Sequence, residues 1–177
     1  MNKEQLHALR FPIGVFITPK NVELKDLNLW IKSIQDFPTT IIALTQDAKN
    51  EQLNTPYRPE GWTLKQVVHH CADSHMSSIK RFKLALTEEA PTIRPYPEHL
   101  FAELIDSKDD DIADSLAIIN AVHRKWTKLL NNMNPGDFEK TFVHPEYGTV
   151  FKLSEATAMY AWHCEHHLGH VRLCLGK

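Results

Sequence analysis

The chain has 177 residues, of which 42% are hydrophobic and 24% are charged, and its formal net charge is −2 with neutral histidines. These values fit one ordinary globular domain, which we assign to residues 1–177. The slightly negative net charge argues against nucleic acid as a partner. The sequence has no run of 18 apolar residues, so no membrane span is expected. The N-terminus lacks an apolar signal segment, and the three cysteines are sparse. We therefore expect a cytoplasmic protein with reduced thiols.

Residues 1–23 contain two prolines, a glycine and several apolar side chains. They predict an extended arm that lies against the body of the domain. A first helix is expected from Leu24 to about Leu44, where apolar residues recur at intervals of three and four. Pro38 falls inside this pattern and should kink or split the helix.

A second helix is expected from Thr63 to about Thr87. Thr63 and Gln66 match the capping box, with the threonine as N-cap. The proline-rich segment 88–100 cannot form a regular helix. A third helix should begin near Asp109–Asp114, whose acidic side chains suit a helix N-terminus, and end near Met133.

A short β-hairpin is predicted from segments 141–144 and 149–152, which flank a proline- and glycine-containing turn. Ser154 is expected to cap a final helix that runs to Lys177. Four long helices and little strand predict an all-α four-helix bundle, with the arm at its start and the hairpin before its last helix.

The final helix carries four of the eleven histidines within eight residues, and these are His163, His166, His167 and His170. At about 100° per residue, all four lie within an arc of roughly 100°. The pairs His163/His167 and His166/His170 both have the i, i+4 spacing that lets two imidazoles bind one ion. Phase against the apolar positions favours the first pair only slightly, but the cluster as a whole predicts a metal site.

The third ligand is expected from the second helix. His70 is in phase with its core-facing positions, whereas His69 should be more exposed. Asp73, His166 and His170 are candidate hydrogen-bond partners of the ligands. His123 and His144 are interpreted as ordinary core histidines.

The cysteines offer alternatives that spacing does not remove. Cys71 and Cys164 adjoin candidate ligands and could themselves bind the ion. A nucleophilic pair of Cys164 with a histidine is also possible in principle, but no third group that would orient it is evident.

Several stretches resemble one protein family, the DinB/YfiT-like metal-dependent hydrolases. They include Trp62–Met76, Arg81–Glu89, Ile93–Tyr96 and the closing Tyr160–His170. The likeness begins at Phe11 and covers most of the chain. The family includes a subgroup that is similar to bacillithiol S-transferases. This chain has Cys71 where that subgroup usually has an aliphatic residue.

The resemblance implies a DinB-type four-helix bundle with one divalent metal ion held by His70, His163 and His167. Zinc is the ion we expect first, with nickel or another divalent ion as alternatives. The resemblance also implies a cytoplasmic homodimer.

An ion held by three neutral imidazoles could activate a water for hydrolysis, or a low-molecular-weight thiol for transfer to a small electrophile. The ligand set does not separate a hydrolase from an S-transferase. A non-catalytic, metal-stabilised bundle that acts as a binding or stress-response protein is the third hypothesis. Arg81, Arg94 and Tyr160 are candidate substrate-binding residues, because an arginine can bind a carboxylate through two hydrogen bonds.

Overall fold

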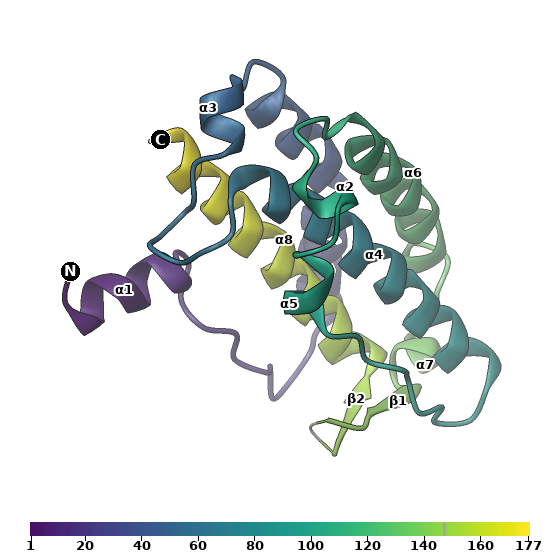
Figure 1. Cartoon of the computed structure of the whole chain (residues 1–177). Helices are drawn as coiled ribbons and strands as arrows, with labels where there is room; N and C mark the ends of the chain where they lie inside the picture. Colours follow the sequence, from purple (N-terminus) through teal and green to yellow (C-terminus); the bar gives the residue numbers. More distant parts are fainter. Residues whose placement is uncertain (147) are drawn as a thin grey trace.

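The computed structural model describes residues 1–146 and 148–177. Its four long helices are α2 (Leu24–Thr45), α4 (Leu64–Thr87), α6 (Ala113–Leu130) and α8 (Leu153–Leu175). Helix α2 packs against α6 and α8, and α4 packs against the same two helices, so the four enclose one core (Figure 1). The predicted four-helix bundle with a hairpin before its last helix is therefore confirmed. None of the described helices has the length and hydropathy needed to cross a membrane.

The capping box at the start of α4 forms as predicted. The Thr63 side chain accepts a hydrogen bond from the backbone N–H of Gln66, and the Gln66 side chain accepts one from the backbone N–H of Thr63. This pair satisfies two of the backbone donors that a helix leaves open at its N-terminus. It fixes the starting phase of α4, and with it the face on which His70 lies.

The hairpin pairs β1 (Thr141–His144) with β2 (Thr149–Lys152) in an antiparallel register that sets His144 opposite Thr149. The proline-rich segment lies beside β1. The backbone N–H of Ile93 donates to the Val143 carbonyl, and the Val143 N–H donates to the Pro91 carbonyl. These bonds hold residues 91–99 over the face of the bundle to which α4 and α8 contribute (Figure 1).

The N-terminal segment differs from the expected extended arm, because Lys3–Arg10 form helix α1. Asn2 and Gln5 make a capping box there, and the prolines and glycine that indicated an arm all follow this helix. The remainder of the arm runs along α8. Gly169 makes this approach possible, since a Cβ atom there would lie 2.7 Å from Cγ of Pro12.

Other boundaries also differ from expectation. Helix α2 continues through Pro38 without a break, so of the two predicted outcomes, a kink or a split, the split is wrong. The N-cap of α8 is Lys152 and not Ser154, which is buried in the first turn. Helix α6 ends at Leu130, three residues early. Short helical turns at α3 (Asn50–Leu53), α5 (Glu98–Phe101), η1 (Asp106–Lys108) and α7 (Pro135–Phe138) were not predicted, because so few residues carry no periodic pattern.

Candidate metal centre and its cavity

Three imidazoles converge between α4 and α8. His163 and His167 lie one turn apart on α8, with ring centroids separated by 4.4 Å, and His70 faces them from α4. One nitrogen from each ring lies within 4.8 Å of the other two. The Nε2 atoms of His70 and His163 are 3.4 Å apart. The structure thus brings together the three histidines selected from the sequence.

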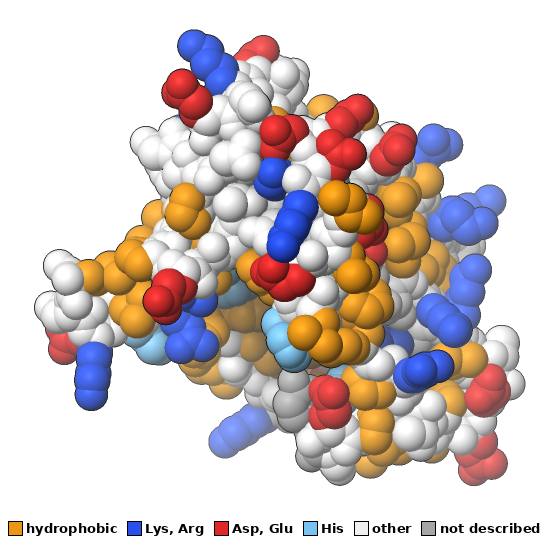
Figure 2. Space-filling model, viewed as in Figure 1, with side chains coloured by type: hydrophobic (Ala, Val, Ile, Leu, Met, Phe, Trp, Pro, Cys, Tyr) orange, Lys and Arg blue, Asp and Glu red, His pale blue; other side chains and the backbone are white. Residues whose placement is uncertain are grey.

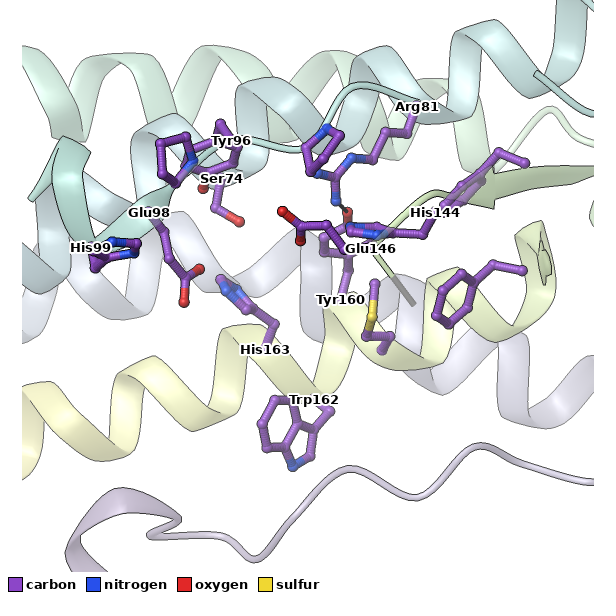
Figure 3. Close-up of a pocket in the computed structure, with 15 residues that line it drawn as sticks. Ser74, Arg81, Tyr96, Glu98, His99, His144, Glu146, Tyr160, Trp162 and His163 are labelled. Carbon is purple, nitrogen blue, oxygen red and sulfur yellow. Dashed lines mark hydrogen bonds between the residues drawn. The ribbon is translucent and has the colours of Figure 1, made fainter. Parts of the chain in front are cut away.

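A cavity of about 500 Å³ adjoins this cluster, and His163 lies in its wall. Histidine side chains are visible in the hollow near the centre of the face shown in Figure 2. The His163 ring points from α8 into the cavity, towards the side chains of α4 and of the proline-rich segment (Figure 3). The other polar residues that line the cavity are Ser74, Arg81, Tyr96, Glu98, His99, His144, Glu146 and Tyr160.

Two other groups of described residues have ligand-like spacing. One is His75, His123 and Cys164, and the other is His166, His167 and His170. The first is fully buried, and both ring nitrogens of His75 and of His123 already make hydrogen bonds. The second contributes no residue to the wall of the cavity. Among the residues that the structure describes, only the His70/His163/His167 group combines convergence with access for a small molecule.

Burial keeps the clustered imidazoles neutral. It lowers the pKa of His70 to about 4, with a further contribution from His166. It also lowers the pKa values of His163 and His167 well below the usual value, and neighbouring histidines add to both shifts. A neutral imidazole offers one lone pair, which is the form that binds a divalent ion. The donor set therefore fits a metal ion.

The stability of the metal-free protein should fall with acidification. Burial lowers the pKa of His123 from 6.5 to about 4, so the folded state resists a proton that the unfolded state accepts. The stabilisation is complete above pH 6.5, the unfolded pKa, and is lost as the pH falls towards 4. Urea midpoints at about pH 7.5 and about pH 5 test this, and we expect a loss of at least about 1 kcal/mol. Equal midpoints would contradict it.

Arg81 and Tyr160 lie together in the cavity wall. Nη1 of Arg81 donates a hydrogen bond of 2.7 Å to the Tyr160 hydroxyl (Figure 3). Arg81 is half-buried, and none of the ion pairs among the described residues involves it. Arg94, in contrast, is exposed and does not line the cavity, although the next residue, Pro95, does.

Of the three candidate hydrogen-bond partners of the ligands, one lies against a ligand imidazole and the other two make no such bond among the described residues. Nδ1 of His170 lies 3.3 Å from Nδ1 of His167. His166 stacks on Trp162, and its buried Nδ1 has no partner in the described part of the chain. Asp73 lies near Asp106 and His69, and no hydrogen bond between described residues joins it to His70.

His69 is buried, contrary to expectation. Its ring bonds to the Ser115 hydroxyl and the Asp109 carbonyl, which ties α4 to the start of α6. The sequence pattern missed this because the partners come from the first turn of α6 and the loop before it, which are distant in sequence.

All three cysteines are free and buried. Burial raises the pKa of Cys71, and it raises that of Cys164 well above the usual value. A neutral, enclosed thiol is a poor nucleophile. The structure therefore gives no support to a cysteine-based mechanism.

Several wall residues were not singled out from the sequence. Tyr96 and Glu98 reach the cavity only because the proline-rich segment pairs with β1, and Glu146 reaches it from the hairpin turn. Tyr96 shares a hydrogen bond with Ser74. Burial raises the pKa of Glu98, whose carboxylate points towards His163 in Figure 3. No local pattern marks such residues, since their position depends on long-range pairing.

Comparison with known proteins identifies the family. The sequence profile of the DinB superfamily matches residues 34–171. The chain belongs to the DinB superfamily. It is 47% identical to a protein of Bacillus mycoides strain KBAB4 over 92% of this chain and 93% of that one, and 46% identical to one of Bacillus cereus strain B4264 over 94% and 95%. Both relatives carry the name "Putative metal-dependent hydrolase".

A solved structure shows the same DinB-type fold. YfiT from Bacillus subtilis superimposes with a TM-score of 0.92 at 40% sequence identity, covering 94% of this chain and 95% of YfiT. That protein is described as a probable metal-dependent hydrolase with an unusual four-helix bundle topology. The names of these DinB relatives and the histidine clusters together imply a metal ion in this chain, and place it among the YfiT-like metal-dependent hydrolases.

Proposed function

We propose that this protein is an enzyme in which His70, His163 and His167 hold one divalent metal ion, zinc in the first instance, beside a substrate cavity. When bound, the ion would supply a nucleophile at neutral pH, from a low-molecular-weight thiol or from water. The observation that carries the proposal is the convergence of three neutral imidazoles, one of which opens to a cavity of about 500 Å³.

The substrate proposal rests on Arg81. None of the ion pairs among the described residues involves this half-buried guanidinium, although Glu98 and Glu146 line the same cavity, so an anion of the substrate can pair with it. Arg81 is held in the wall by the Tyr160 hydroxyl, which leaves its other N–H groups available. We therefore infer a small electrophile or thiol that carries a carboxylate or a similar anion, bound by Arg81 with Tyr160 as its support. Arg94 lies outside this cavity and takes no part in this proposal.

The cavity volume is in the range of sites that hold small organic molecules, which both candidate reactions require. Thiol transfer, of the bacillithiol S-transferase type, is our first candidate because of the resemblance to bacterial thiol-dependent enzymes. Hydrolysis is the second, and the names of the relatives support it. The resemblance to bacterial thiol-dependent enzymes also supports a cytoplasmic homodimer, which sedimentation of the full chain would test.

One assay separates these candidates. Zinc-loaded protein is mixed with a monohalogenated bimane and, in turn, bacillithiol, cysteine or no thiol. We expect a zinc-dependent rate that requires the thiol and is absent with the metal-free protein. A zinc-dependent release of halide without thiol would support hydrolysis instead. If no thiol and no ester or amide substrate reacts, a non-catalytic, metal-stabilised bundle remains.

A further inference from the structure

Two histidine chains lead from the proposed ligands to backbone carbonyls. In the first, Nδ1 of His163 lies 3.1 Å from Nε2 of His75, and Nδ1 of His75 lies 2.8 Å from Nε2 of His123. Nδ1 of His123 then bonds to the carbonyl oxygen of Ile34. In the second, Nδ1 of His167 lies 3.3 Å from Nδ1 of His170, whose Nε2 lies 3.2 Å from the carbonyl oxygen of Arg10.

Both carbonyl oxygens can accept a hydrogen bond from a histidine because neither has a partner N–H within its own helix. The carbonyl of Ile34 would ordinarily bond to the N–H of residue 38, but Pro38 has no N–H. The carbonyl of Arg10 belongs to the last residue of α1, where helical carbonyls lack partners. The arm can approach closely enough to present it because Gly169, next to His170, has no side chain.

A carbonyl oxygen can only accept, and this sets the proton on each ring in turn. His123 must donate from Nδ1, so the Nε2 of its neutral ring accepts from Nδ1–H of His75. Nε2 of His75 then accepts from Nδ1–H of His163. By the same logic His170 donates from Nε2 to Arg10, and its Nδ1 accepts from Nδ1–H of His167.

We propose that these two chains fix His163 and His167 in the Nδ1–H tautomer, so that each presents a bare Nε2 lone pair to the metal ion. His75, His123 and His170 are thus positioning residues that preset two of the three ligands. This inference rests on the proposed ligand set. It explains why buried histidines surround the site, since partners of this kind orient ligand imidazoles and raise their basicity.

The tautomers can be observed without metal or substrate. In ¹⁵N-labelled, metal-free protein, two-bond nitrogen–proton spectra should show protonated Nδ1 and unprotonated Nε2 on His163 and His167, with resonances assigned by single substitutions. Protonated Nε2 on either ring would overturn the proposal. This measurement is independent of any activity, so the proposal can hold even if the assay above finds no turnover.

Zinc affinity, measured by competition with a chromophoric chelator, tests the positioning role. His123→Phe keeps a ring beside Phe37 but leaves His75 free to turn its proton towards His163. His170→Phe keeps the stack on Tyr57 but removes the acceptor for His167. We expect each to weaken zinc binding by about 10–100-fold.

Matched variants separate tautomer control from packing. His123→Gln and His170→Asn each place an amide oxygen where it can accept the same proton, and both should recover most of the affinity. Equal affinity in the phenylalanine and amide variants would overturn the proposal. If His123→Phe fails to fold, the His170 pair and the spectra of the unsubstituted protein still decide it.

Discussion

Replacing His163 with alanine is expected to abolish stoichiometric zinc binding and to lower any zinc-dependent turnover by about 10²-fold or more. His163 is the ligand candidate that also lines the cavity, so its loss removes both a donor and the wall from which a nucleophile would be presented. The remaining pair, His70 and His167, would offer an ion only two imidazoles, which is too few to keep it bound. The number of bound zinc ions can be determined by mass spectrometry of the native protein, and the zinc affinity can be measured by chelator competition.

The control for this variant comes from the same helix. His166 belongs to the rival group with His167 and His170, but not to the group that opens to the cavity. His166→Ala should therefore keep one zinc ion per chain. Its buried Nδ1 has no partner among the described residues, so the substitution leaves no donor or acceptor unpaired. If His166→Ala loses zinc while His163→Ala keeps it, the ion binds in the His166/His167/His170 group instead.

The candidate site was largely predictable because it depends on helical phase. The i, i+4 spacing placed four histidines on one face of α8, and the apolar pattern of α4 turned His70 towards it. The capping box made that phase dependable, since it fixed where α4 begins. What phase did not settle was the choice between two pairs on α8. In the structure the cavity is lined by His163 and not by His166 or His170, which favours the first pair.

The parts that escaped prediction depend on contacts between distant segments. His123 was interpreted as an ordinary core histidine. Its significance appears only when α2 brings the carbonyl of Ile34 to one side of it, and α4 brings His75 to the other. Pro38 was expected to distort α2, but its effect is to leave that carbonyl without a helical donor. The Arg10 carbonyl depends on a helix α1 that the proline pattern of the arm concealed.

Replacing Arg81 with glutamine is expected to raise KM for an anionic substrate by about 10–100-fold, because a charge-assisted hydrogen bond contributes about 1.5–3 kcal/mol. Zinc affinity should not fall, since Arg81 bonds to Tyr160 and not to a ligand histidine, and its positive charge disfavours a cation near His163. Steady-state kinetics with an anionic electrophile and a neutral one of similar size provide the measurement.

The pair of electrophiles distinguishes anion binding from a structural role for Arg81. If the arginine only supports the wall through Tyr160, both substrates should lose rate together, and Tyr160→Phe should reproduce the loss. If it binds the anion, the neutral substrate is spared, and Arg81→Lys recovers only part of the affinity because an ammonium lacks the planar pair of donors. Tyr160→Phe should then have a smaller effect than Arg81→Gln, since the guanidinium keeps its charge in the wall. An equal loss with both electrophiles would contradict the proposal that Arg81 recognises the substrate.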